Sequence, residues 1–276
     1  MHKVLEVSGL SKRYGEGCPS CFEKTGPEFD TNICPDCGSV VAAHNLSFDL
    51  YQGEILGIMG ESGSGKSTAV KCLFFDQEPT GGSATFYDQD QAYPLFSLNK
   101  AQQRRLSNHR FGMVYQNPHL GLNFDISAGG NIAERLLMSG VDHYGDIRQR
   151  AIDLLSRTEV LTQRIDELPK NFSGGMQQRV QIAKALATNP PLLFLDEVTT
   201  GLDLSVQAAI LDLILEIQHQ EKTSMIVVTH DLGVIRLLAD RTLVMKYGRV
   251  IESGLTDQIL EDPQHAYTQR LVASAL

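Results

Sequence analysis

The 276-residue sequence has no apolar run long enough to cross a membrane as a helix. Such a span needs about 18 or more consecutive apolar residues. The longest apolar runs here, residues 190–195 and 225–228, have the length of strands. The N-terminal residues also lack the apolar core of a signal peptide. We therefore expect a cytoplasmic chain, and any role at a membrane would need a separate partner chain.

Positive charge is also scarce. Lys and Arg number 24 against 33 Asp and Glu, for a net charge of −9, and no stretch forms a basic stripe. This argues against a nucleic-acid partner. The hydrophobic share of 42% is that of an ordinary globular protein. With no internal repeat or low-complexity tract, the length fits one large domain, alone or with an appendage.

Strand and helix patterns alternate around a helical middle. Short apolar or alternating segments predict strands, and apolar residues at helical spacing predict helices. The expected strands are residues 3–8, 45–50, 54–59, 192–195 and 225–229, with a hairpin over 243–246 and 249–252; the expected helices are 68–75, 147–158, 173–187 and 206–218. This predicts an α/β core with a helical subdomain over approximately residues 101–170.

A glycine-rich segment between a predicted strand and a predicted helix fits the pattern GxxxxGK[ST] in full. Its glycines let backbone N–H groups point inward at phosphate, and the helix N-terminus adds its dipole. Lys66 would neutralise the β- and γ-phosphates of ATP, and the Ser67 hydroxyl would hold Mg²⁺. A chance loop is the alternative, which the flanking elements argue against. The expected ATP-binding residues are Gly60, Glu61, Ser62, Gly63, Ser64, Gly65, Lys66, Ser67 and Thr68.

Two acidic residues follow the buried strand at 192–195. Asp196 is expected to hold Mg²⁺. Glu197 is expected to act as the general base toward the attacking water. Alone, this pattern also fits charges at the end of any strand; together with the phosphate-binding loop it indicates a nucleotide-hydrolysing site.

The segment at residues 173–179, SGGMQQR, resembles the signature of ATP-binding cassette (ABC) ATPases. It is a second glycine-bearing helix N-terminus, and therefore a second anion site. In that family the signature serves the nucleotide held by the other protomer. The resemblance thus implies a dimer, with a homodimer expected. The residues implied to act in trans are Ser173, Gly174, Gly175 and Gln177.

The other motifs of the family occur in order, from Tyr14 to His230. Tyr14 matches the aromatic residue that stacks on adenine. Gln116 matches the glutamine that reaches Mg²⁺ and water and senses the partner, so the implied Mg²⁺ set is Ser67, Gln116 and Asp196. Asp203 matches the D-loop. His230 matches the histidine that contacts the γ-phosphate, although a lone histidine after a strand is more often structural.

The resemblance covers nearly the whole chain, so we expect one ABC ATPase domain over residues 1–276. It implies an ABC-type nucleotide-binding domain with a P-loop α/β core, an antiparallel β subdomain and a helical subdomain. It also implies hydrolysis of ATP to ADP and phosphate. One position departs from the family, where Pro usually follows the catalytic Glu: here it is Val198. We expect an altered loop rather than an inactive site.

Finer similarity points to the ABC ATPases of the carbon–phosphorus lyase system, which act in phosphonate metabolism. It lies in residues 127–136, 142–148, 164–169, 228–234 and 237–240. The resemblance implies a partner in a soluble lyase core. The alternative is the ATP-binding subunit of an oligopeptide or nickel importer, which shares residues 253–257 and 265–269. A third possibility is a non-catalytic ATP-binding scaffold, against which Glu197 and His230 argue.

An insert over residues 15–39 carries the spacing C-x₂-C-x₁₂-C-x₂-C. Two CxxC turns can present four thiolates to one tetrahedral ion, and in a reducing compartment clustered cysteines favour a metal. We expect a structural Zn²⁺ in this zinc knuckle, with iron or reversible disulfides as alternatives. The insert would be a docking element for the partner, or a clamp near the nucleotide. The expected metal ligands are Cys18, Cys21, Cys34 and Cys37.

Overall fold

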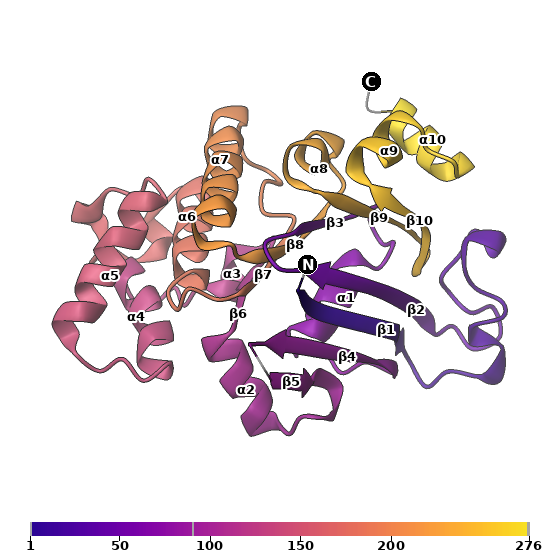
Figure 1. Cartoon of the computed structure of the whole chain (residues 1–276), viewed down its shortest axis with the longest axis horizontal. Helices are drawn as coiled ribbons and strands as arrows, with labels where there is room; N and C mark the ends of the chain where they lie inside the picture. Colours follow the sequence, from indigo (N-terminus) through magenta and orange to yellow (C-terminus); the bar gives the residue numbers. More distant parts are fainter. Residues whose placement is uncertain (1, 90, 275–276) are drawn as a thin grey trace. The chain divides into compact units, whose positions relative to one another are not determined.

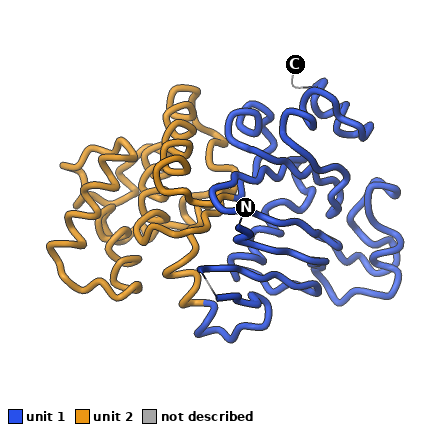
Figure 2. Tube along the Cα trace, in the orientation of Figure 1, with its two compact units in different colours: residues 1–103, 226–276 blue, residues 104–225 orange. Residues whose placement is uncertain are grey.

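The structure is a computed structural model that describes residues 2–89 and 91–274. The chain forms an α/β fold with two sheets and divides into two compact units (Figures 1 and 2). Unit 1 consists of residues 1–103 and 226–276, and unit 2 of residues 104–225. No helix in the described part of the chain has the length and apolar character of a membrane span.

A four-stranded antiparallel sheet in unit 1 has the order β2-β1-β4-β5. Its strands are β1 (Lys3–Tyr14), β2 (Val40–Tyr51), β4 (Gly81–Asp88) and β5 (Gln91–Pro94). Apolar side chains face one another across β1 and β2, as in the pairs Leu5 with Leu50 and Val7 with Phe48. This sheet bears out the antiparallel part of the expected fold, although the sequence did not indicate β4 or β5.

β1 is one long strand, whereas the sequence pattern predicted a strand only over residues 3–8. Its register with β2 shifts between Val7 and Leu10, and Gly9 there has a φ of 64°. A bulge of this kind lets the strand continue past an interruption of its alternation. At its far end Tyr14 pairs with Val40, so the two ends of the insert are neighbours across the sheet.

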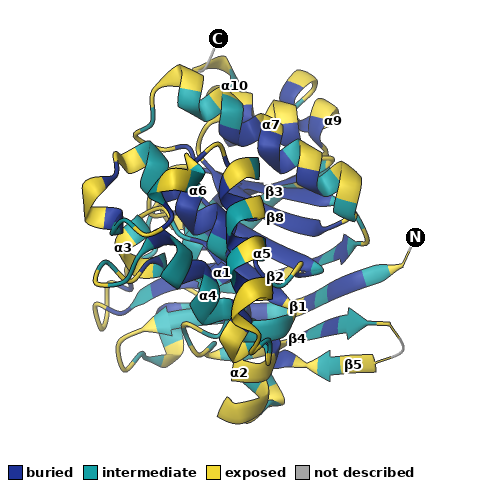
Figure 3. Ribbon diagram, turned by 90° about the vertical axis from the view of Figure 1, so that its left-hand side faces the viewer, coloured by how far each residue is buried: buried dark blue, intermediate teal, exposed yellow. Residues whose placement is uncertain are grey.

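Unit 1 also contains strands in the order β10-β9-β3-β8. β3 runs parallel to β9, and β9 and β10 form the predicted hairpin. All residues of β3 and β8 are buried (Figure 3), as expected for strands covered on both faces. The elements are β3 (Ile55–Met59), α1 (Lys66–Leu73), β8 (Ser224–Thr229), α8 (Leu232–Leu238), β9 (Arg241–Lys246), β10 (Arg249–Leu255), α9 (Thr256–Glu261) and α10 (Ala266–Ala273).

Unit 2 is mainly helical, with two parallel strands, β6 and β7. Phe111 of β6 packs its ring edge-on against Phe194 of β7. The strand expected at residues 192–195 is β7, whereas β6 lies in a region predicted to be helical, because four apolar residues directly after a helix do not show a strand period. The elements are α2 (Lys100–His109), β6 (Phe111–Val114), α3 (Pro118–Gly121), α4 (Ala128–Met138), α5 (Tyr144–Arg157), α6 (Gly174–Ala185), β7 (Leu192–Asp196) and α7 (Leu204–Glu221).

Short 3₁₀ turns complete both units. They are η1 (Pro19–Cys21), η2 (Pro27–Phe29), η3 (Leu95–Ser97), η4 (Thr162–Arg164) and η5 (Pro169–Asn171). The first two belong to the cysteine insert, which has no other regular structure apart from isolated bridges between Gly26 and Thr31 and between Ile33 and Val40. The insert is therefore a loop held by turns and by its four cysteines.

Candidate functional site

The phosphate-binding loop connects β3 to α1 and depends on glycine at defined positions. Gly60 and Gly65 have φ angles of 149° and 104°. A Cβ on Gly65 would lie 1.8 Å from the Ala42 carbonyl oxygen, and one on Gly60 would lie 2.2 Å from the Met245 carbonyl oxygen. Only glycine fits such close backbone approaches. At Gly63, by contrast, an added Cβ would meet nothing within 4 Å.

Polar groups inside this loop suit a polyphosphate. Lys66 is buried, and its ammonium donates to the carbonyl oxygens of Gly60 at 2.7 Å and Glu61 at 2.9 Å. The buried hydroxyl of Ser64 has no hydrogen-bond partner in the described structure. A buried cation, an unsatisfied hydroxyl and a helix N-terminus in one glycine-rich cradle are the features that bind phosphate. Ser67 and Thr68 follow in the first turn of α1, as expected.

Tyr14 and His230 also lie in unit 1. Tyr14 ends β1 with a partly exposed ring, its hydroxyl donates to Gln77 Oε1, and the Lys12 ammonium lies 5.0 Å from the ring centroid. His230 is exposed and directly follows β8. The next residue, Asp231, caps α8 by accepting from Gly233 N–H at 2.7 Å. The histidine therefore sits at a rigid junction between a buried strand and a capped helix.

The two acidic residues, Asp196 as the last residue of β7 and Glu197 directly after it, lie in unit 2 in different environments. Asp196 is buried at the end of the strand. Glu197 has a left-handed φ of 49°, and its Oε2 accepts from Gln116 Nε2 at 2.8 Å and Thr200 Oγ1 at 3.4 Å. Val198, which stands where the family usually has Pro, is 3% exposed. In the family a proline ring at this position would fix φ. Here the loop is held by the packing of the buried Val198 side chain.

Helix α6 holds the segment that carries Gln116. Tyr115 N–H donates to Gln181 Oε1 at 2.8 Å, and the Tyr115 carbonyl accepts from the side-chain amides of Gln178 at 3.2 Å and Gln181 at 3.0 Å. Both glutamines are buried. The sequence pattern did not single out these two residues; the available signal was two glutamines three residues apart, which share one face of the predicted helix.

The signature residues lie at the start of α6. Ser173 caps the helix by accepting from Met176 N–H, and an added Cβ on Gly174 would meet nothing within 4 Å. The side-chain amide of Gln177, a residue expected to act in trans, donates within this chain to the carbonyls of Pro169 at 3.0 Å and Phe172 at 3.1 Å. In this structure Gln177 thus stabilises its own helix start, while the backbone around Gly174 has open space.

Asp203 begins α7 as its N-cap. Its carboxylate accepts from Ser205 Oγ at 2.6 Å and from Val206 N–H at 2.9 Å, and these hydrogen bonds lower the pKa of Asp203. Leu204 beside it is 84% exposed. Gly201 just before it adopts a φ of 77°. The turn expected to be the D-loop is therefore capped by Asp203 and presents the large apolar side chain of Leu204 to solvent.

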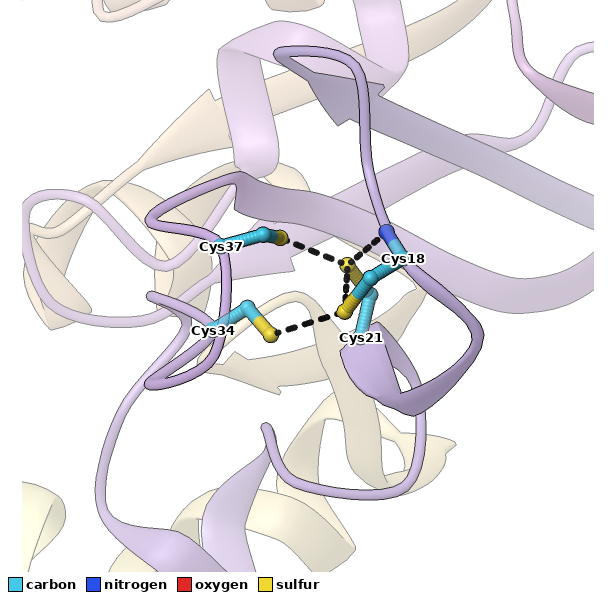
Figure 4. A group of neighbouring side chains, drawn as sticks. All are labelled: Cys18, Cys21, Cys34 and Cys37. Atoms are coloured by element: carbon cyan, nitrogen blue, oxygen red, sulfur yellow. Dashed lines mark hydrogen bonds between the residues drawn. The ribbon is translucent and has the colours of Figure 1, made fainter.

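The four insert cysteines converge on one point (Figure 4). Cys18 Sγ lies 3.7 Å from Cys21 Sγ and 3.6 Å from Cys34 Sγ, and Cys21 Sγ lies 3.5 Å from Cys37 Sγ. A tetrahedral zinc with bonds of about 2.3 Å sets its sulfurs about 3.8 Å apart, so the spacing suits such an ion. No disulfide joins the cysteines, and all four sulfurs are available as ligands.

The surroundings of the thiols differ. Burial raises the pKa of Cys18 to about 12. The Ser39 hydroxyl and backbone N–H lower the pKa of Cys37 to about 6. Cys21 and Cys34 are buried, whereas Cys37 is exposed. The cluster is thus a closed set of four donors with one edge at the surface.

Known proteins share this chain's architecture. The family model described as ABC transporter matches residues 43–200. The phosphonates utilization ATP-binding protein PhnK of Escherichia coli is 52% identical over 84% of this chain and 90% of its own length. The oligopeptide transport ATP-binding protein OppD of Bacillus subtilis is 39% identical over 86% of this chain and 67% of its own length.

A solved structure agrees with these relatives. It is the dimer of an ATP-binding cassette in a post-hydrolysis state bound to ADP and Pi. It superposes with a TM-score of 0.77 at 27% identity, covering 91% of this chain and 98% of that one. With the phosphate-binding loop, the acidic pair after β7 and the signature helix in place, the chain belongs to the ABC transporter family and is an ATPase that hydrolyses ATP to ADP and phosphate.

Proposed function

We propose that this ATPase is the MgATP-hydrolysing subunit of a phosphonate carbon–phosphorus lyase complex. One observation supports the proposal. The chain is 52% identical to a protein named for phosphonate utilization and only 39% identical to one named for oligopeptide transport. In this function a cytoplasmic homodimer closes around ATP and drives a conformational change in a soluble lyase core. No nucleic acid takes part.

In unit 1, the phosphate-binding loop receives the triphosphate. Loop N–H groups and Lys66 face the β- and γ-phosphates, and the orphan hydroxyl of Ser64 gains a phosphate oxygen as its partner. Tyr14 stacks its exposed ring on adenine. Ser67, with Asp196 and Gln116, would hold Mg²⁺, and the ion would supply positive charge to the phosphate oxygens.

Hydrolysis is assigned to Glu197. Its carboxylate takes a proton from water while the water oxygen attacks the γ-phosphorus; the bond to the β–γ bridging oxygen breaks and ADP departs. The hydrogen bond from Gln116 Nε2 to Glu197 Oε2 holds the carboxylate in one orientation. His230 holds the γ-phosphate and the water in position.

A second protomer completes each nucleotide site in this proposal. Its Ser173 hydroxyl and the N–H groups around Gly174 and Gly175 face the γ-phosphate held by the first protomer. The open space at Gly174 and the dimeric state of the similar cassette support this arrangement. Asp203, capped within its own loop, lies at the interface between the protomers.

The cysteine cluster is assigned a structural Zn²⁺. Four thiolates at tetrahedral spacing leave no coordination position open for a substrate. The ion would hold together an insert with few apolar residues of its own. Metal analysis of the purified chain should give one zinc per chain, and a Cys34→Ser/Cys37→Ser chain should contain none.

The alternative function, as a subunit of an importer, rests on the 39% identity to a peptide-transport protein. The two functions differ in the proteins that should copurify with the chain. The tagged chain, expressed from its own locus in phosphate-starved cells given a phosphonate, should copurify with soluble lyase proteins. The Glu197→Gln variant, arrested with ATP bound, should retain more of them than wild type, whereas Lys66→Ala should retain fewer. Recovery with integral membrane subunits and no lyase protein would establish the importer function instead.

A further inference from the structure

The cysteine cluster and the phosphate-binding loop are joined through consecutive residues of β2. The buried side chain of Val41 packs against Cys21 and Cys34, in the small apolar core of the insert. The carbonyl oxygen of the next residue, Ala42, occupies the space where Gly65 has no room for a Cβ. β2 therefore packs against the proposed metal ligands through Val41 and against the phosphate-binding loop through Ala42.

The insert is also bound to the β9–β10 hairpin of the same unit. Asp30 Oδ1 accepts from Lys246 Nζ at 2.6 Å. Arg249 Nη2 donates to the carbonyls of Phe22 at 2.7 Å and Thr25 at 3.1 Å. Hydrogen bonds from a charged guanidinium to two carbonyls are stronger than neutral ones and fix the direction of the segment.

The turn of that hairpin holds the phosphate-binding loop. Gly248 N–H donates to the Ser64 carbonyl at 2.9 Å, and the Gly248 carbonyl accepts from His44 N–H at 2.7 Å. Lys246 and Arg249, which contact the insert, flank this turn at residues 247–248. Displacement of the insert would therefore act on the turn that holds Ser64.

One insert side chain contacts the loop directly. Asn32 Nδ2 donates to the Gly63 carbonyl at 3.4 Å. The Asn32 backbone is itself fixed, since its carbonyl accepts from Val41 N–H at 2.8 Å. Asn32 lies two residues before the ligand Cys34, so the fold of the knuckle sets where this amide points.

We propose that the metal-loaded knuckle positions the phosphate-binding loop for MgATP, with Asn32 and Arg249 as positioning residues. This proposal rests on the zinc site proposed above and gives that site a second role, in nucleotide binding. An insert whose core is formed by cysteines, Val41 and Phe22 folds only when its ion is bound. Binding of the ion would thus fix three contacts of the phosphate-binding loop together: with the Ala42 carbonyl, with the turn of the β9–β10 hairpin, and with the Asn32 side chain.

The test measures the affinity for a nonhydrolysable ATP analogue with Mg²⁺, alongside zinc content and steady-state kinetics. Asn32→Asp keeps the shape of the side chain but removes its N–H donor, and Arg249→Ala removes both bonds to the insert carbonyls. Each should retain one zinc per chain and raise the dissociation constant about two- to tenfold, the effect of one or a few net hydrogen bonds. KM for ATP should rise in parallel, with little change in kcat.

The matched control is Lys24→Ala. Lys24 forms an exposed pair with Asp36 at 2.8 Å inside the insert. Its loss should leave nucleotide affinity unchanged. Wild-type protein stripped of zinc by a chelator, with the chelator removed, should bind the analogue as weakly as the Asn32 and Arg249 variants or more weakly. Added zinc should restore the affinity.

The outcomes separate the claims. If Asn32→Asp and Arg249→Ala keep their zinc and bind nucleotide like wild type, the positioning role is wrong while the zinc site stands. If the wild-type chain holds no metal, both are wrong. Loss of lyase proteins from the purified complex, by contrast, bears only on the proposed partner. The two positioning variants leave every cysteine in place, so they decide the matter even if the cysteine variant fails to fold.

Discussion

The side-chain amide of Gln116 donates to the carboxylate of Glu197 at 2.8 Å, within unit 2. Gln116 was expected from the sequence to sense the partner, and Glu197 is the base proposed above. Because Tyr115 is held by two glutamines of α6, a movement of the signature helix would move Gln116 with it. Glu197 is thus linked to α6 through Gln116 and through the hydrogen bonds of the neighbouring Tyr115 to that helix.

Replacing this amide with an acid should slow hydrolysis. Gln116→Glu removes the N–H donor and places a second carboxylate beside Glu197, so two like charges compete for one site. We expect kcat at saturating MgATP to fall about tenfold or more. Affinity for a nonhydrolysable analogue without Mg²⁺ should stay near wild type. Equal kcat for Gln116→Glu and wild type would show that this contact has no part in turnover.

The assigned base itself should account for most of the turnover. Glu197→Gln should lower kcat by about 10²–10⁴-fold, the usual contribution of a general base, while the chain still binds ATP. A steady-state phosphate-release assay measures this, with the exposed Glu261→Gln as control. Undiminished turnover in Glu197→Gln would favour the non-catalytic scaffold.

The two loop glycines Gly65 and Gly63 should respond differently to alanine. Both have positive φ, but only Gly65→Ala would also place its Cβ 1.8 Å from a backbone oxygen. We expect Gly65→Ala to destabilise the fold by about 3 kcal/mol or more and to abolish MgATP binding. Gly63→Ala should cost about 1 kcal/mol of backbone strain. Denaturant unfolding and nucleotide titration of both variants measure this, and equal losses would contradict it.

His44 should make the insert sensitive to acid. Its ring stacks on Phe22 at 4.3 Å, and burial, with the charge of Arg249, lowers the pKa of His44 below 6.5. Because the unfolded imidazole binds its proton first as pH falls, this contribution to stability is complete above the unfolded pKa and is lost as pH falls through the folded one.

His44→Phe keeps the stacked ring and removes the titration. Melting temperatures of the zinc-loaded proteins between about pH 8 and pH 5 should therefore fall less steeply for the variant than for wild type. Parallel curves would show that His44 does not titrate against folding. Comparing the two proteins in the same metal state removes the contribution of the thiols, which both share.

The sequence predicted those parts of the site whose chemistry depends on local order. The phosphate-binding loop needs glycines between a strand and a helix, and the acidic pair needs the end of a buried strand; both patterns are visible within ten residues. The signature helix and the hairpin at residues 241–255 are confirmed for the same reason. Family membership and ATPase activity followed from these segments.

What the sequence missed depends on partners far along the chain. β6 is recognisable only beside β7, because its four residues have no period of their own. Gln178 and Gln181 became functional candidates only once Tyr115 lay against them. The cysteine spacing of the insert is visible in the sequence. The residue that binds the insert's carbonyls, Arg249, lies more than 200 residues later in the chain. No local pattern encodes such a contact.

The pairing of Tyr14 with Val40 has a consequence for how this cassette is constructed. The chain leaves one strand and re-enters the adjacent one at directly opposed positions, so a hairpin turn of a few residues can close the same ladder. Excision of the intervening loop would leave every cross-strand pair of the sheet intact. The ladder between β1 and β2 therefore does not depend on the knuckle, whose removal would take away only its contacts to the β9–β10 hairpin and to the phosphate-binding loop.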